Sequence, residues 1–120
     1  MTASISGKCH CGAVGFELSE APKSLVDCNC TACRRIGALW GHVEQRAYQR
    51  TGTGNTISYM HGDMKLAFHT CVSCGCTTHW EGHDPEHSHM AVNFRMCEPE
   101  VVIEFAVRKF DGFESWEFLD

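Results

Sequence analysis

Nine cysteines in a chain of 120 residues constrain the fold more than any other feature, because most of them fall into tight clusters. The clusters are Cys9 with Cys11, Cys28 with Cys30 and Cys33, and Cys71 with Cys74 and Cys76, whereas Cys97 stands alone. The odd number argues against a complete disulfide framework, and a Cys-x-Cys pair rarely meets the narrow geometry of a relaxed disulfide. In a reducing compartment such clusters are typical of metal sites, so the sequence predicts a zinc protein.

Length and charge bound the kind of protein. A chain of 120 residues predicts one domain spanning 1–120, and 43% hydrophobic with 21% charged residues is typical of a soluble globular protein. A formal net charge of -5 disfavours the phosphate-neutralising surface that nucleic acid requires. The chain shows no apolar run near the ~20 residues of a membrane helix, and its first residues do not resemble a secretory signal. We therefore expect a cytoplasmic protein that binds neither nucleic acid nor membrane.

Short segments of alternating polarity predict an all-β fold. Val14, Phe16 and Leu18 alternate with small or polar neighbours, as in a half-buried strand. Similar segments lie at 24–27, 38–43, 56–60, 66–69, 77–80 and 89–94, with turn residues between them. Helix is minor: residues 31–36 predict one turn that ends at Gly37, and a chain reversal is predicted at Asp111 and Gly112.

The first and third clusters each predict a metal half-site. Cys71-x-x-Cys74 is followed by Gly75, and glycine tolerates the left-handed backbone that brings both sulfurs to one side. Cys9-x-Cys11 is followed by Gly12 and needs a bend, since its sulfurs would face opposite ways in an extended strand. Two such half-sites would supply the four thiolates of a closed zinc site. The alternative is that Cys71 or Cys74 is only a buried thiol.

The second cluster differs in its number of ligands. Cys28, Cys30 and Cys33 offer three thiols, and three protein ligands leave a fourth position for water or substrate, as in a catalytic zinc site. The alternative is a closed site whose fourth ligand is Cys76, Cys97 or a histidine. The spacing alone leaves both interpretations open.

The order of these motifs resembles the glutathione-dependent formaldehyde-activating enzyme family, also called the GFA or centromere-protein-V-like family. The resemblance rests on three segments, which are Gly7-x-Cys9-x-Cys11-Gly12-x-Val14, Cys28-x-Cys30-x-x-Cys33-Arg34-Arg35-x-Gly37 and Cys71-x-x-Cys74-Gly75. The segment Val92-Asn93-Phe94-Arg95-Met96-Cys97 and the Phe110-Asp111-Gly112 tail are also similar to that family.

The resemblance implies an Mss4-like fold of small antiparallel sheets stapled by two zinc ions. It implies a structural zinc on Cys9, Cys11, Cys71 and Cys74, and a second zinc, associated with activity, on Cys28, Cys30 and Cys33. The activity that it implies is that of a carbon–sulfur lyase, joining formaldehyde to glutathione as S-hydroxymethylglutathione and running in reverse. The partners would be a small-molecule thiol and an aldehyde. The Mss4-like fold also serves as a non-catalytic zinc scaffold for protein partners, which is the alternative function.

Other polar residues have plainer interpretations. Arg34 and Arg35 could pair with a substrate carboxylate, but a solvated surface pair is favoured. His83, His87 and His89 predict a polar surface loop, with proton shuttling or metal capture as the alternative.

The remaining cysteines and the tryptophans are expected inside the fold. Cys76 and Cys97 are expected to be small buried residues, and Cys97 is the better candidate to approach the second metal. Trp40, Trp80 and Trp116 are expected in the core or in a pocket wall.

Overall fold

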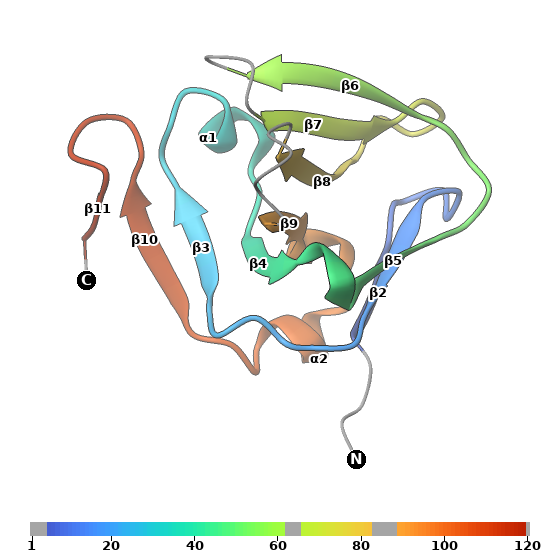
Figure 1. Ribbon diagram of the computed structural model, residues 1–120, viewed down its shortest axis with the longest axis horizontal. Helices are drawn as coiled ribbons and strands as arrows, with labels where there is room; N and C mark the ends of the chain where they lie inside the picture. The colour runs from blue at the N-terminus through green and yellow to red at the C-terminus, as the bar shows by residue number, and fades with distance from the viewer. Residues whose placement is uncertain (1–4, 62–65, 83–88, 120) are drawn as a thin grey trace.

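Eleven strands in two sheets make up about half of the described chain, which comprises residues 5–61, 66–82 and 89–119 of a computed structural model (Figure 1). The strands are β1 (Ile5–Lys8), β2 (Gly15–Leu18), β3 (Leu25–Cys28), β4 (Trp40–Glu44), β5 (Tyr48–Thr51), β6 (Thr56–His61), β7 (Leu66–Cys71), β8 (Thr77–Gly82), β9 (His89–Asn93), β10 (Val107–Asp111) and β11 (Glu117–Phe118). The helices are short, namely α1 (Cys33–Ile36), α2 (Pro99–Val102) and the 3₁₀ turns η1 (Gln45–Ala47) and η2 (Phe94–Met96). The predicted mainly-β class is confirmed.

The two sheets differ in size and in the relative direction of their paired strands. The smaller has the order β1-β2-β5, and the larger has the order β11-β10-β3-β4-β9-β8-β7-β6. The described neighbours pair antiparallel except for β10 and β3, which run parallel with Phe110 opposite Cys28. Figure 1 shows the small sheet and the β10–β11 hairpin on opposite sides of the molecule. The sequence analysis missed β1, β5, β10 and α2.

Each face of the larger sheet packs into its own core, because strand residues alternate between the two faces. The core that faces the small sheet contains Phe16, Leu18, Leu25, Met90, Val92 and Phe94. The core on the other face contains Val26, Trp40, Phe68, Trp80 and Ala91. Fully burying one such large side chain contributes roughly 1.5–3 kcal/mol. The second core holds the pocket described below.

No helix in the described part of the chain is long and apolar enough to cross a membrane.

Candidate metal centres and pocket

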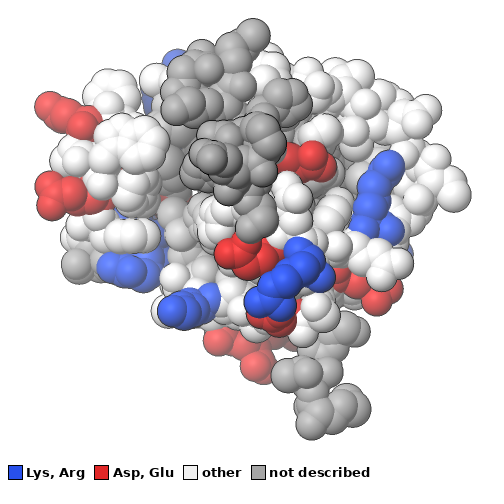
Figure 2. All heavy atoms as spheres, in the orientation of Figure 1, with Lys and Arg blue, Asp and Glu red and all other residues white. Residues whose placement is uncertain are grey.

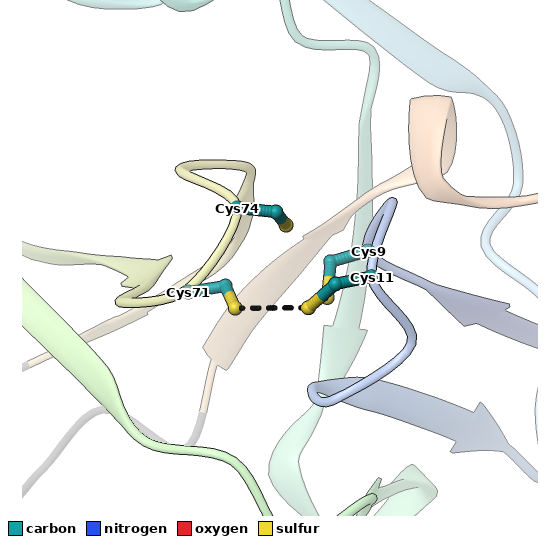
Figure 3. A group of neighbouring side chains, drawn as sticks. All are labelled: Cys9, Cys11, Cys71 and Cys74. Carbon is teal, nitrogen blue, oxygen red and sulfur yellow. Dashed lines mark hydrogen bonds between the residues drawn. The ribbon is translucent and has the colours of Figure 1, made fainter.

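Four cysteines that are distant in sequence come together between the two sheets (Figure 3). Cys9 and Cys11 follow β1, Cys71 ends β7, and Cys74 lies in the next turn. The four Sγ atoms lie within 4.8 Å of one another, with Cys9 3.6 Å from Cys11 and Cys11 3.7 Å from Cys71. A Zn–S bond of about 2.3 Å places two sulfurs about 3.8 Å apart across a tetrahedral ion. The four thiols therefore fit one zinc ion.

Two glycines bend the chain so that the sulfurs converge. Gly12 and Gly75 both have a φ of 82°, which L side chains rarely adopt. The Gly12 N–H donates to the Cys9 carbonyl at 3.0 Å, and the Gly75 N–H donates to the Cys71 carbonyl at 2.9 Å. The bends expected from the glycine positions are thus present in both half-sites.

Backbone donors favour the thiolate form in this group. Hydrogen bonds from the backbone N–H groups of Cys11 and Cys76 lower the pKa of Cys74 to about 5. The Val14 N–H lies 3.4 Å from Cys9 Sγ, and the Ser73 N–H lies 3.4 Å from Cys71 Sγ. These bonds favour the thiolates of Cys71 and Cys74, whereas desolvation and the neighbouring thiols raise the pKa of Cys11 to about 12, so a bound cation would have to displace its proton.

The second group consists of Cys28 at the end of β3, Cys30 in the following turn and Cys33 at the start of α1. Their Sγ atoms also lie within 4.8 Å of one another. Cys33 N–H donates to Cys30 Sγ at 3.2 Å, and the indole N–H of Trp40 donates to Cys33 Sγ at 3.3 Å. Among the described residues, no fourth histidine, cysteine or carboxylate belongs to this group.

The three thiols do not ionise equally. A hydrogen bond from Cys33 lowers the pKa of Cys28 to about 6, against the opposing effect of burial. The same bond raises the pKa of Cys33 far above its ordinary value. Cys28 therefore ionises before Cys33, and an incoming cation would displace the remaining protons.

Gly112 closes one side of this group. It follows β10, and a Cβ built on it would lie 2.6 Å from Cys28 Sγ and 3.3 Å from Cys30 Cβ. The backbone of Gly112 also hydrogen-bonds the Cys28 sulfur. Glycine is required here because a side chain would collide with the Cys28 sulfur. Its φ does not lie in the left-handed region, so backbone conformation is not the reason.

The three thiols open onto a cavity of about 500 Å³ on one face of the larger sheet. Its lining residues are mostly apolar or aromatic, namely Val26, Cys28, Cys30, Cys33, Trp40, His42, Leu66, Phe68, Trp80, Phe110, Gly112, Trp116 and Phe118. The volume is that of a small-molecule site. Such an apolar wall strengthens electrostatic interactions at the sulfurs.

His42 is a pocket residue that the sequence analysis missed. Burial, reinforced by the neighbouring His89, lowers the pKa of His42 to about 4. The two imidazoles stack with their centroids 5.2 Å apart. His42 is therefore neutral near pH 7. The sequence could have identified His42, because it lies two residues after Trp40 on β4 and residues at this spacing face the same side of a strand.

Cys97 lies away from the second group, and the expectation that it approaches that metal is wrong. It packs in the core between the sheets with Phe16 and Phe94. The turn η2 interrupts the alternation of β9, so the strand pattern could not assign a face to Cys97. Burial raises its pKa to about 11, which suits an inert core thiol. Cys76 is half-buried and packs beside Cys9 and Cys71.

The remaining predicted residues lie as follows. Arg34 and Arg35 are exposed on α1, and Arg35 donates to the Thr31 carbonyl at 2.8 Å. His83 and His87 lie outside the described residues, and His89 is exposed. Trp40 and Trp80 form the pocket wall as expected, whereas Trp116 lines the pocket although it is 73% exposed.

Charged side chains of both signs are scattered over the face in Figure 2 rather than gathered by sign.

Comparison with known proteins places the chain in a family. A family model described as glutathione-dependent formaldehyde-activating enzyme matches residues 4–106. The crystal structure of a Rhodobacter sphaeroides protein, a structural genomics target, is similar with 26% identity and a TM-score of 0.68, covering 86% of this chain and 99% of that chain. The search of curated proteins gave no match. Because the family model spans most of the sequence, the chain belongs to the glutathione-dependent formaldehyde-activating enzyme family.

Proposed function

We propose that this protein is a zinc-dependent carbon–sulfur lyase that joins an aldehyde to a small thiol and also runs in reverse. The observation that supports it most is the three-thiol group of Cys28, Cys30 and Cys33 opening onto an aromatic-walled cavity of about 500 Å³. Family membership supports the same reaction class. A site with three protein ligands leaves room for one exchangeable ligand.

The residues around the group have distinct roles in this proposal. A zinc ion held by the three thiolates supplies a Lewis acid at its open position. The Trp40 indole N–H fixes the orientation of Cys33, and the aromatic wall keeps water from the reacting atoms. As the thiol sulfur bonds to the aldehyde carbon, the carbonyl oxygen takes up the proton that the thiol loses. The imidazole of His42 lines the same cavity, but its pKa of about 4 makes it too weak a base to hold that proton near pH 7.

The group of Cys9, Cys11, Cys71 and Cys74 serves the fold in this proposal. One zinc ion held there would join residues 60 apart, from Cys11 to Cys71, and the four thiols could supply all of its ligands. Closing a long loop is where such a cross-link stabilises most.

The pocket chemistry bears on which thiol is used. The lining residues given above include neither lysine nor arginine among the described residues. Glutathione carries carboxylates that would gain from a cationic partner. A small neutral thiol therefore suits the described wall better than glutathione, and a comparison of thiols tests this directly.

The first test measures the loss of free formaldehyde with the zinc-loaded protein and a series of thiols that includes glutathione. We expect a protein-dependent rate for at least one thiol. Cys30→Ser should abolish this rate and lower bound zinc from about two ions to about one per chain without unfolding, because only the open site is lost. Zinc content and circular dichroism provide the readouts.

Cys97→Ala is the matched control, because this core thiol belongs to neither metal group. It should keep both zinc ions and the rate. If the wild type binds two zinc ions and yet shows no rate above the spontaneous reaction with any thiol, catalysis is excluded. The non-catalytic zinc scaffold would then be the better interpretation.

A further inference from the structure

A third group of ligand atoms lies outside both cysteine groups. His69 on β7 pairs directly with His79 on β8, and Glu81 follows two residues later on the same face of β8. Their chain neighbours Phe68 and Trp80 face the opposite side of the sheet and line the pocket. The group therefore lies on the opposite face of the larger sheet from the proposed active site.

The three side chains converge without bonding one another. His69 Nε2 lies 3.8 Å from Glu81 Oε1, and His79 Nε2 lies 3.5 Å from the same oxygen. These separations exceed the roughly 2.7–3.2 Å of a hydrogen bond. Metal–nitrogen and metal–oxygen bonds of about 2.0–2.1 Å would place two ligands about 3.4 Å apart across a tetrahedral ion. A small inward movement would therefore complete three coordination bonds.

Hydrogen bonds on the far side of each ring hold the Nε2 atoms in position. Thr78 Oγ1 lies 2.9 Å from His79 Nδ1 and can accept from an Nδ1–H group there. Thr56 Oγ1 lies 3.2 Å from His69 Nδ1. A proton on Nδ1 leaves the Nε2 lone pair free, which is the arrangement found in histidine metal ligands. The rings stack at 4.6 Å between centroids and 5° between planes.

Burial and charge define the environment. The side chains of His79, His69 and Glu81 are 4%, 20% and 43% exposed, so the group opens to solvent on the carboxylate side. Burial, with smaller effects of His69 and Arg50, lowers the pKa of His79 to about 3 and keeps it neutral. The positive charge of Arg50 opposes a cation, and the Glu81 carboxylate offsets it. Tyr48 on β5 packs against His79 at 5.4 Å.

We propose that His69, His79 and Glu81 form a third metal site that binds a divalent transition-metal ion such as zinc. Imidazole and carboxylate suit zinc and its neighbours in the first row, and three protein ligands leave positions for water. The ion joins β7 to β8 just before the Cys71–Cys74 turn, so it stiffens the strand pair that carries half of the first cysteine group. This site does not depend on the proposed catalytic function.

The probe is Co²⁺ added to protein whose cysteine groups are already filled with zinc. We expect one Co²⁺ per chain by calorimetry, with absorption bands that lack thiolate-to-cobalt charge transfer. Glu81→Gln and His69→Gln should each weaken binding by about tenfold or more, since each removes a coordination bond. Arg50→Gln should strengthen binding, because it removes the opposing charge. Zinc added beyond two equivalents should raise the Tm of the wild type but not of Glu81→Gln.

Two controls separate this site from adventitious binding. The double variant His83→Gln/His87→Gln tests the histidine-rich segment, and Glu114→Gln tests a surface carboxylate elsewhere. Both should bind Co²⁺ as the wild type does. Unchanged binding in Glu81→Gln and His69→Gln, or loss of binding in the His83/His87 variant, would overturn the proposal. The zinc-loaded Tm without added metal establishes that each variant is folded.

Discussion

Single residues around Cys28 determine whether the second cysteine group can hold a metal. The Trp40 N–H and the Cys33 N–H each direct a proton toward a sulfur, and Gly112 leaves room for the Cys28 thiol. The cysteine spacing predicted which thiols meet, because short turns fix the geometry within each cluster. It could not predict Gly112, whose contact with Cys28 depends on pairing between strands far apart in the chain.

Gly112→Ala should remove the second metal and spare the first. The new methyl group would lie 2.6 Å from Cys28 Sγ, and the ligand atom itself would have to move. We expect bound zinc to fall from about two ions to about one per chain and the thiol–aldehyde rate to fall with it. Atomic absorption and the formaldehyde assay measure both.

Glu114→Ala in the same turn is the matched control, since its side chain is exposed and is not among the residues that line the cavity. It should retain both ions. If Gly112→Ala also keeps two zinc ions, the turn can move to accommodate the methyl group, and the close approach of Gly112 to Cys28 is not needed for metal binding.

The β10–β11 hairpin is the element that completes the pocket. Phe110, Gly112, Trp116 and Phe118 all line the cavity, and the Phe110 and Trp116 rings pack edge to face at 5.6 Å. The turn at Asp111 and Gly112 was predicted from sequence and is confirmed. The strand β10 and its parallel pairing with β3 were not predicted, because residues 107–111 do not alternate regularly and no local pattern identifies a strand's neighbour.

Asp111 holds this hairpin turn together. Its carboxylate accepts from the Glu114 and Ser115 N–H groups at 3.1 Å and from the Ser115 hydroxyl at 2.9 Å. The bonds from Ser115, with smaller contributions from Asn29 and Glu114, lower the pKa of Asp111 to about 2. A lowered pKa means that this stabilisation is complete above the ordinary value and is lost as pH falls through about 2. The turn is therefore ordered at any pH near neutrality.

Asp111→Ala should loosen the hairpin without removing either zinc ion. We expect the Glu114 and Ser115 amides to exchange with deuterium at least about tenfold faster, because loss of local hydrogen bonds lowers the opening free energy. The KM for the thiol should rise as the pocket wall becomes mobile. Ser115→Ala removes only the hydroxyl bond and should show a smaller effect. Equal exchange in Asp111→Ala and wild type would contradict this role.

At the scale of the whole molecule, the first cysteine group joins the small sheet to the large one. Cys9 and Cys11 follow β1, and Cys71 ends β7. The sequence predicted both half-sites from the Cys and Gly spacing, but their pairing came from the family resemblance, since no local pattern encodes a contact across 60 residues. The cluster of His69, His79 and Glu81 was missed for the same reason, because only the β7–β8 register brings it together.

Stepwise removal of metal should separate the two cysteine groups. A chelator should first take the ion from Cys28, Cys30 and Cys33 with loss of activity and little change in circular dichroism. Loss of the second ion should unfold the chain, because a structural zinc contributes about 10–16 kcal/mol, comparable to the roughly 5–15 kcal/mol stability of a domain. Cys74→Ser should fail to fold for the same reason. Unfolding that coincides with release of the first ion would contradict this division.

The parallel contact between β10 and β3 also has a consequence for biosynthesis. The ribosome releases the chain from its N-terminus, so Cys28, Cys30 and Cys33 emerge long before residues 107–118. The nascent thiols must therefore wait, without one wall of their cavity, until residues 107–118 have been synthesised.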